Sequence, residues 1–216
     1  MAVGWAIGPL GPGEIEMHGE LRSSRAWSTM KVPVIVACIT CGRADWHAIE
    51  LAISRSDNEA ALALWAALDD PLAEVEAVLR RAGDTDTDVE HQPDPRGWSP
   101  FGRTVWSLEA AVTFYRALAR GELLDGPDTS RVLDAMARIV PEQRWGLGRL
   151  PGVSFKGGWG PSETPGGGYE VIQVGIVGPA VIALAASAAD FGAAKELASK
   201  HVPQHQDTPQ LRATGD

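Results

Sequence analysis

The chain of 216 residues has few of the residue types that mark several common protein classes. It contains two cysteines and five histidines, and these do not repeat at the spacings of metal ligands. We therefore expect no metal site and no cofactor. Lys and Arg total 19 against 28 Asp and Glu, which gives a net charge of −9. A nucleic-acid partner is not expected, because binding to a duplex needs a basic face.

Long hydrophobic runs are also missing, since no apolar segment reaches the roughly 18 residues of a membrane-spanning helix. The nearest, residues 171–189, is interrupted by Gly178-Pro179, which favours two strands joined by a turn. No basic stretch precedes an apolar one after Met1, so we expect no signal peptide. Two locations stay open on this basis: the cytoplasm, or a trimmed mature domain outside it.

The two cysteines form the string Cys38-Ile39-Thr40-Cys41. A redox C-x-x-C motif stands at the start of a helix, where the helix dipole lowers a thiol pKa. Here the string falls about two turns into a predicted helix. We favour two small buried residues that lie one turn apart.

Hydrophobic periodicity predicts an α+β protein with strands near both ends and helices between them. The predicted strands span residues 2–8, 14–20, 153–156, 169–177 and 181–186. The predicted helices span residues 28–40, 45–53, 71–82, 107–119, 128–139 and 191–200, with one more that begins at Ser56 or Asp57. The strands would form one antiparallel sheet packed by helices, beside a small all-α part.

We expect a single domain over residues 1–200, with its sheet part over about 1–27 and 150–200 and its helical part over about 28–149. The polar tail over residues 201–216 is expected to be disordered. Between the helices, residues 84–103 read as a loop rich in Asp, Thr, Pro and Gly. A loop of about twenty residues is long enough to be either functional or disordered.

Ser28-Thr29-Met30-Lys31 is the first of three strings that suggest chemistry. Ser28 and Lys31 share one face at the start of a predicted apolar helix. The helix start leaves the N–H of Ser28 unpaired and favours an oxyanion there. Desolvation would lower the pKa of Lys31, so that its neutral amine could act as a base. Taken alone, an N-cap serine and a surface lysine explain this string better.

Ser56-Asp57-Asn58 is the second string and falls on a break between predicted helices. Ser56 would relay a proton to a leaving nitrogen, and Asn58 would hold a substrate amide. Taken alone, this string is better explained as a helix cap.

Lys156-Gly157-Gly158 is the third string and ends a predicted strand. Lys156 would anchor a substrate carboxylate and bias the Ser56 proton. The glycines allow close backbone approach, which leaves the N–H of Trp159 as a second oxyanion donor. The alternative is an edge-strand lysine before a glycine turn.

In this order and on these elements, the three strings resemble the S-x-x-K, S-D-N and K-T-G motifs of class A β-lactamases and penicillin-binding proteins. Ala26-Trp27 before the first string, Gly83-Asp84 with Thr87 before the long loop, and residues 119–124 after it are also similar to that superfamily of serine hydrolases. The resemblance covers roughly residues 2–200. It implies an antiparallel sheet with a small all-α subdomain, here trimmed.

The resemblance also implies roles for individual residues. The implied catalytic residues are Ser28, Lys31, Ser56 and Lys156. The implied substrate-binding residues are Asn58, Gly158 and Trp159, with the N–H groups of Ser28 and Trp159 as the oxyanion hole. A small-molecule β-lactam, ester or peptide substrate and an extracytoplasmic location are implied as well, while the oligomeric state stays open.

The chain departs from this family at three places. Residues 84–103 contain no Glu-x-x-Leu-Asn string, which in class A enzymes positions the hydrolytic water, and Glu90 and Asp94 lack its neighbours. Gly157 stands where the family has Thr or Ser, a loss of about 1 kcal/mol for one hydrogen bond. The segment from Lys31 to Ser56 is also much shorter.

Three hypotheses follow from these departures. The first is a β-lactamase-like serine hydrolase that forms an acyl-enzyme through Ser28, with weak or no β-lactam turnover. The second is a penicillin-binding relative that acylates and stalls, and the third is a degenerate scaffold that only binds a ligand. Five tryptophans would line a cleft or, as aromatic residues more often do, fill a core: Trp27, Trp98, Trp106, Trp145 and Trp159.

Overall fold

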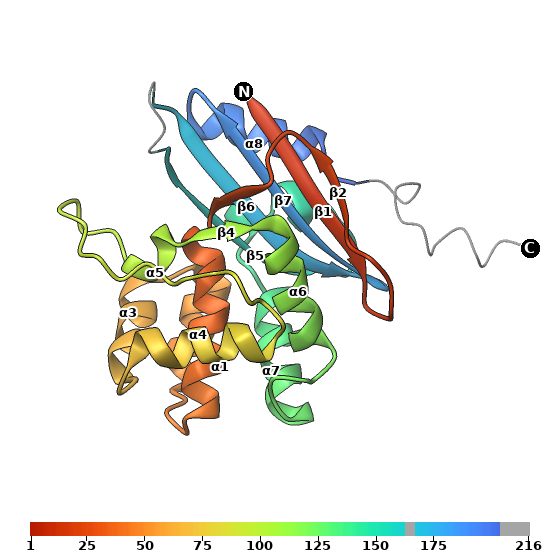
Figure 1. Ribbon diagram of the computed structural model, residues 1–216. Coiled ribbons are helices and arrows are strands. Elements are labelled where there is room, and N and C mark those ends of the chain that lie inside the picture. The colour runs from red at the N-terminus through yellow and green to blue at the C-terminus, as the bar shows by residue number, and fades with distance from the viewer. Residues whose placement is uncertain (163–166, 204–216) are drawn as a thin grey trace, which may run out of the picture.

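The computed structural model, which describes residues 1–162 and 167–203, is an α+β protein (Figure 1). A five-stranded sheet, with every neighbouring pair antiparallel, has the order β2-β1-β7-β6-β5. The strands are β1 (Ala2–Pro9), β2 (Glu16–Gly19), β5 (Ser154–Pro161), β6 (Tyr169–Val177) and β7 (Ala180–Ala188). The predicted sheet of N- and C-terminal strands is therefore confirmed.

The central strand β7 explains why helices cover both faces of the sheet. Its side chains alternate, as the two-residue period of a strand requires. Ile182 and Leu184 pack in a cluster with helix α8 (Phe191–Lys200), while Val181 and Ala183 belong to the main core on the opposite face. Helix α6 (Leu108–Ala119) packs on that opposite face against β1, β6 and β7. The many alanines of β7 let both helices approach closely.

The helical part surrounds α1 (Lys31–Thr40), whose residues are buried from Lys31 to Cys38. A helix that is apolar on all sides is a core helix, as the sequence predicts. It packs against α3 (Asn58–Ala67) and α4 (Pro71–Arg81). The carboxylates of Asp57 and Asp70 cap these two helices by accepting backbone N–H groups. Helices α2 (Trp46–Glu50) and α7 (Gly126–Ala137) complete the helical part.

A second sheet of two short strands joins the two parts of the molecule. Strand β3 (Ser23–Arg25) pairs with β4 (Val105–Ser107), and helix α5 (Pro100–Arg103) precedes β4. These elements are not predicted from the sequence, because segments of three or four residues carry too little periodicity to be recognised. They matter for function, since β3 leads directly into the segment that holds Ser28.

Several predicted boundaries are wrong for identifiable reasons. The helix expected from Ser28 begins at Lys31, because Trp27 has a φ of +47° and starts a 3₁₀ turn, η1 (Trp27–Met30), instead. Strand β5 continues past Lys156 to Pro161, since pairing with β6 persists through the glycines. The helix expected to start at 128 begins at Gly126, because Asp125 is its cap.

The two cysteines differ in exposure, so the expectation that both are buried is wrong. Cys38 lies inside α1 and its thiol contacts the carbonyl oxygen of Leu64 at 3.2 Å. Cys41 is exposed because α1 ends at Thr40, and the next residue projects beyond the packed part of the helix. The C-x-x-C spacing here therefore joins one core residue and one surface residue.

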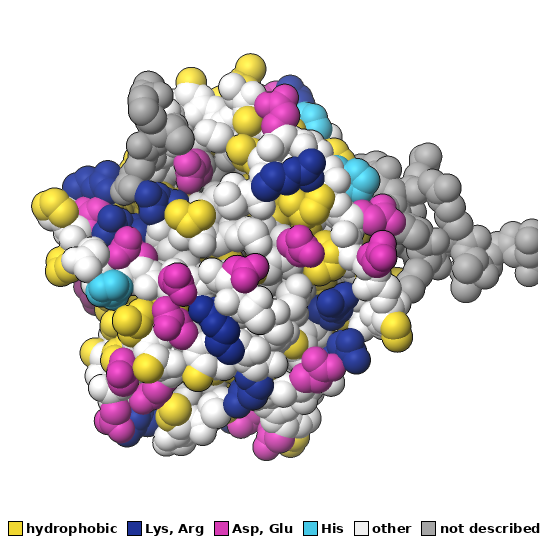
Figure 2. Space-filling view, in the orientation of Figure 1, with side chains coloured by type: hydrophobic (Ala, Val, Ile, Leu, Met, Phe, Trp, Pro, Cys, Tyr) yellow, Lys and Arg dark blue, Asp and Glu magenta, His cyan; other side chains and the backbone are white. Residues whose placement is uncertain are grey.

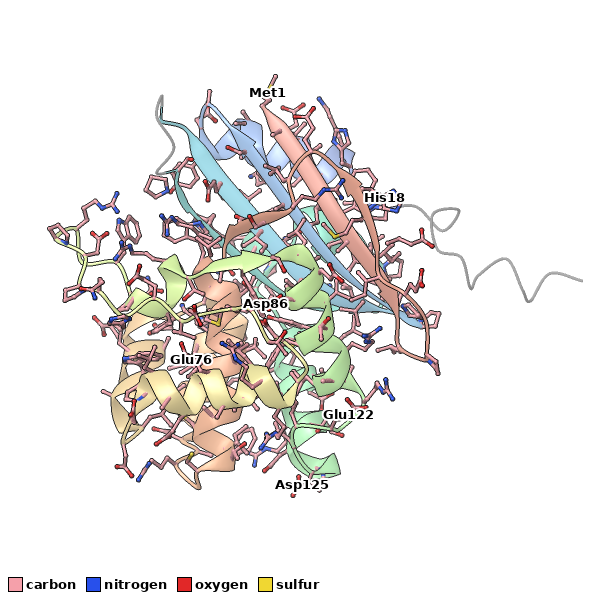
Figure 3. The ribbon with its side chains drawn as sticks, in the orientation of Figure 1. Met1, His18, Glu76, Asp86, Glu122 and Asp125 are labelled. Carbon is pink, nitrogen blue, oxygen red and sulfur yellow. The ribbon has the colours of Figure 1, made fainter. Side chains whose placement is uncertain are left out.

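Charged residues of both signs are interspersed on the face shown in Figure 2. Figure 3 places Glu76, Asp86, Glu122 and Asp125 around the helical part and His18 at the sheet edge. Among residues 1–162 and 167–203, no helix has both the length and the apolar character to cross a membrane. Most of the tail that was expected to be disordered, residues 204–216, lies outside the described residues.

Candidate active site

Ser28 lies in η1, where the helical part meets the edge strand β5. A Cβ atom added to Gly158 of β5 would come within 2.6 Å of the Ser28 backbone nitrogen, so only glycine allows this approach. Ser28 is partly exposed, and its hydroxyl makes no hydrogen bond within the described part of the chain. The serine is thus accessible and has no structural partner to hold its hydroxyl.

Trp27 also fixes the position of Ser28 by packing against β5. It is 5% exposed, and its indole ring lies against Gly160, where any side chain would clash at 2.3 Å. A positive φ in a bulky residue costs on the order of 1–3 kcal/mol and persists only where the surroundings enforce it. The turn at Ser28 is therefore imposed by packing of Trp27 against β5, and not by local preference.

Lys31 is 2% exposed and reaches from α1 to the second motif. Its amine donates to the carbonyl oxygens of Ser56 at 2.6 Å and Asp57 at 3.0 Å, and to Oδ1 of Asn58 at 2.7 Å. Burial lowers the pKa of Lys31 to about 7, in the direction expected from the sequence, and the charge of Asp57 partly opposes this. Three acceptors also favour the ammonium form, so the amine is poised between its two states near neutral pH.

Ser56 follows a π-helical turn, η2 (Leu51–Arg55), and has a left-handed backbone with φ of +59°. Single π turns inside helices occur often at functional sites. The contacts of Lys31 with the carbonyl groups of Ser56 and Asp57, directly after this turn, hold the unusual backbone in place. The break that the sequence indicates is thus a specific turn that directs the Ser56 side chain toward Lys156.

Lys156 connects the third motif to the second. It is fully buried, and its amine donates to Oγ of Ser56 at 2.9 Å and to the carbonyl oxygen of Gly157 at 2.9 Å. Burial, and then the nearby charge of Lys31, hold its pKa well below that of an ordinary lysine. Ser56 therefore lies between two amines with lowered pKa, one at its hydroxyl and one at its carbonyl.

Asn58 links these groups to solvent. Because the Lys31 amine can only donate, the amide oxygen of Asn58 must face it, and the amide nitrogen is then left for another partner. Asn58 is exposed and lines the same cleft as Ser28 and Trp159. All seven residues proposed from the sequence thus lie around one place, although no contact joins the Ser28 hydroxyl to Lys31.

The cleft has a cavity volume of about 80 Å³. Its walls come from η1, from α3, from the end of the long loop with α5, and from β5. The lining residues are Trp27, Ser28, Asn58, Leu62, Gly97, Trp98, Ser99, Gly102 and Trp159. Three of the five tryptophans thus line the cleft, whereas Trp106 and Trp145 are buried in the cores.

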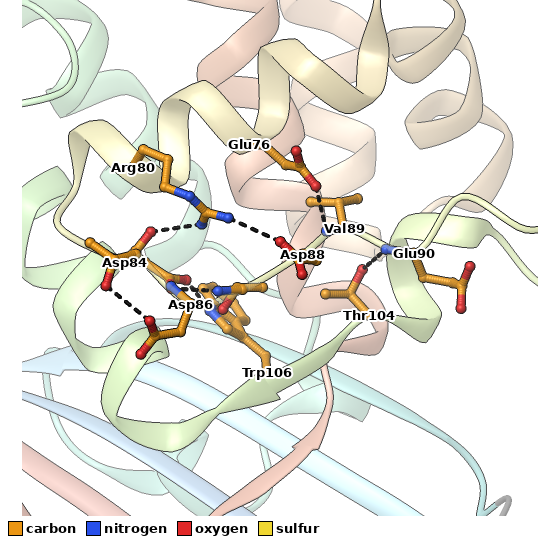
Figure 4. A network of polar contacts seen from close by, with 11 residues as sticks. Glu76, Arg80, Asp84, Asp86, Asp88, Val89, Glu90, Thr104 and Trp106 are labelled. Carbon is orange, nitrogen blue, oxygen red and sulfur yellow. Dashed lines mark hydrogen bonds and ion pairs between the residues drawn. The ribbon is translucent and has the colours of Figure 1, made fainter.

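The long loop is anchored at its start by a polar network, shown in Figure 4. Asp84 accepts a hydrogen bond from Nε1 of Trp106 at 2.9 Å, and Arg80 of α4 donates to the Asp84 carbonyl oxygen at 2.8 Å. Glu76 of α4 accepts the N–H of Val89 at 2.9 Å. These contacts fix the first half of the loop to the helical part.

The two acidic residues of the loop that the sequence analysis considered do not line the cleft. Glu90 accepts the N–H groups of His91 and Gln92, which lower its pKa. Asp94 pairs with Arg96 at 2.6 Å and with Arg103 at 3.2 Å, and the hydrogen bond from Arg96 lowers its pKa to about 2. Both carboxylates therefore have other partners, and neither has the raised pKa of a base in an apolar site.

Four of the cleft residues are not predicted from the sequence, namely Leu62, Gly97, Ser99 and Gly102, and the sequence does not distinguish Trp98 from core tryptophans. Trp98 packs edge-on against Trp27, with ring centroids 5.6 Å apart. A tryptophan inside a polar, glycine-rich segment was the available signal, because such a segment offers no core of its own to receive it.

A family model described as the β-lactamase enzyme family, Beta-lactamase2, matches residues 46–159, just over half of the chain. The matched range contains Ser56, Asn58 and Lys156 and begins after Ser28 and Lys31. No curated protein matches the chain.

Solved structures similar to this one include several β-lactamases. The chromosome-encoded β-lactamase of Vibrio parahaemolyticus has a TM-score of 0.69 at 17% identity, over 92% of this chain and 89% of that one. A β-lactamase from Sphaerobacter thermophilus has a TM-score of 0.68 at 19% identity, over 91% and 87%. An ancestral class A β-lactamase has a TM-score of 0.67 at 20% identity, over 92% and 90%. At these identities the likeness concerns the fold.

Proposed function

The chain belongs to the β-lactamase enzyme family, and we propose that it is a serine hydrolase that forms an acyl-enzyme through Ser28, with weak or no turnover of β-lactams. The observation that carries this proposal is the chain of contacts from Lys156 through Ser56 and Lys31 to Asn58, beside an accessible serine. These contacts join three motifs that are far apart in the sequence.

In the proposed acylation, the neutral amine of Lys31 takes the proton of the Ser28 hydroxyl as Oγ attacks the substrate carbonyl carbon. The N–H groups of Ser28 and Trp159 stabilise the resulting oxyanion. The bond to the leaving group then breaks, and the leaving atom takes the hydroxyl proton of Ser56. The ammonium form of Lys156 donates a proton to Ser56 across their 2.9 Å contact and becomes neutral, a release that the new positive charge on Lys31 favours.

Asn58 sets the state of the base in this scheme. Its Oδ1 accepts from Lys31 while its amide nitrogen donates to the substrate. A substrate that draws the side-chain amide of Asn58 into the cleft weakens the hydrogen bond from Lys31 to Oδ1. The ammonium form of Lys31 is then stabilised less. Substrate binding and release of a neutral Lys31 amine are thereby coupled.

Deacylation is the weak step in this proposal. Hydrolysis of the acyl-enzyme needs a base that activates water, and the described residues that line the cleft include no carboxylate. A long-lived acyl-enzyme, as in a penicillin-binding protein, is the second candidate function and rests on this same observation. The third is a fold that binds its ligand without chemistry.

Intact-mass spectrometry tests these functions after the protein is mixed with a penicillin or with a fluorophosphonate. A covalent adduct in the wild type that is lost in Ser28→Ala supports acylation at Ser28. The matched control is Ser99→Ala, which removes the other serine of the cleft and is expected to keep the adduct. Penicillin turnover without an adduct favours the hydrolase, and a persistent adduct favours stalling. With neither, the binding function stands and the acylation proposal fails.

A further inference from the structure

We propose that the acyl group accepted by this cleft is neutral and aromatic, so that the preferred substrates are aryl or arylalkyl esters or amides without a carboxylate. This inference rests on the proposed acylation of Ser28 and names the class of substrate for it. It separates this chain from enzymes whose substrates are anionic, because no cationic side chain lines the cleft among the described residues.

The lining of the cleft is the first observation. The described residues around Ser28 include no Lys, Arg, His, Asp or Glu. Polar contacts come only from Asn58 and Ser99 beside the nucleophile. A carboxylate that enters such a site loses water without gaining a cationic partner, which is strongly unfavourable.

The two nearby lysines do not supply that partner. The three N–H groups of Lys31 are matched by three protein acceptors. Lys156 has no exposed surface and donates to Ser56 and to the Gly157 carbonyl oxygen. Both amines are directed at Ser56 and its neighbours, so neither amine is left to pair with a carboxylate in the cleft.

The paired strands β5 and β6 also lack a side chain that is available to bind an anion next to Lys156. Gly157 carries no hydroxyl, and the residue opposite it on β6 is Gln173. The amide of Gln173 is committed on both sides, since it accepts the N–H of Leu147 at 2.7 Å and donates to the carbonyl oxygen of Trp145 at 2.9 Å. Neither strand therefore offers a side-chain donor to a carboxylate next to Lys156.

Aromatic surface is what the cleft offers instead. Trp27, Trp98 and Trp159 line it together with Leu62, and Trp27 and Trp98 meet edge to face. The indole N–H groups of Trp27 and Trp98 are buried and have no partner among the described residues. Indole rings bind flat apolar groups, so this surface suits an aromatic part of a substrate.

The size of the cleft limits what enters. A volume of about 80 Å³ is well below the roughly 300–1,000 Å³ of common ligand pockets. One compact planar group can lie against the tryptophans of the lining while the remainder of the substrate stays in solvent. A single aromatic ring joined to the reacting carbonyl by a short link fits this description.

Matched esters test the proposal. We expect kcat/KM for p-nitrophenyl phenylacetate to exceed that for its 4-carboxyphenylacetate analogue by about tenfold or more, because the added charge finds no partner. The acetate ester, which lacks the ring, is expected to react more slowly than the phenylacetate. Equal or faster reaction of the carboxylate-bearing ester would overturn the proposal.

Substitutions at two positions test which residues cause the preference for neutral aromatic substrates. Trp98→Leu is expected to lower the phenylacetate-to-acetate ratio of kcat/KM by about tenfold, and Trp98→Phe to restore most of it. Gly157→Ser is expected to raise the rate for the carboxylate-bearing ester relative to the neutral one. The serine is sterically feasible, because a Cβ at Gly157 meets its nearest neighbour at 3.5 Å. An unchanged ratio in Trp98→Leu would contradict the aromatic site.

Binding to the Ser28→Ala protein separates this inference from the proposed chemistry. Quenching of tryptophan fluorescence by phenylacetamide and by 4-carboxyphenylacetamide reports binding without acylation. Tighter binding of the neutral amide supports the inference even if no ester acylates the wild type, in which case only the proposed function fails. Tighter binding of the carboxylate, or no binding of either amide, would overturn the inference.

Discussion

The pH dependence of Ser28 acylation tests the proposed role of Lys31 most directly. Burial holds the pKa of this amine at about 7, against 10.5 for an ordinary lysine. The base must be neutral, so acylation is expected to rise with pH and to level off above the folded-state pKa. The charge of Asp57 partly opposes this shift of the Lys31 pKa, and burial together with the charge of Lys31 lowers the pKa of Lys156.

The magnitude follows from the neutral fraction of the amine. With a pKa of about 7, that fraction is about 0.1 at pH 6 and about 0.9 at pH 8, a rise of roughly tenfold with a plateau beyond. An ordinary lysine would give a rise of about a hundredfold over the same interval and no plateau. A lysine with the lowered pKa and an ordinary lysine would therefore give pH–rate profiles that differ both in slope and in shape.

The assay is the rate of fluorophosphonate adduct formation, followed by intact mass from about pH 5.5 to 9. Lys31→Arg keeps a positive charge near Ser56 and removes the base, so this variant is expected to lose most of the rate and its titration. A wild-type rate that rises with unit slope through pH 9 would refute the lowered pKa. A midpoint near 7 that persists in Lys31→Arg would assign the titration to another group, such as Lys156, and refute the role of Lys31.

Two further predictions concern stability and are measured by urea unfolding. Gly158→Ala places a Cβ 2.6 Å from the Ser28 nitrogen and is expected to lower the free energy of unfolding by about 1–3 kcal/mol. The neighbouring Gly157→Ala meets only ordinary contacts and serves as the control, so equal losses in the two variants would contradict the close approach of β5. Asp84→Ala leaves the buried N–H of Trp106 and the backbone N–H groups of Asp86 and Thr87 without their acceptors, and is expected to lower the free energy of unfolding by about 1–3 kcal/mol. Asp84→Asn keeps one of the two accepting oxygens and is expected to lose less; the reverse order would contradict the network.

Much of the fold was predictable because it rests on local patterns. The alternation in β7, the apolar character of α1, and the capping carboxylates of α3 and α4 are visible within about ten residues of sequence each. The pairing of β3 with β4 was not predictable, since it joins three-residue segments some eighty positions apart. The same holds for the 3₁₀ turn at Ser28, which depends on how Trp27 packs against Gly160.

The candidate site also has features that are local in the sequence and features that depend on long-range packing. The sequence by itself determined which residues form the three strings and that these adjoin a helix, a break between helices and a strand, because residue type and hydrophobic period are local properties. Only the tertiary structure decided that Lys31 contacts Asn58 and the Ser56 carbonyl, that Lys156 reaches the Ser56 hydroxyl, and that three tryptophans meet beside Ser28. Those contacts arise from packing between segments up to a hundred residues apart, and the direction of a buried amine is set by the acceptors that such packing brings within reach.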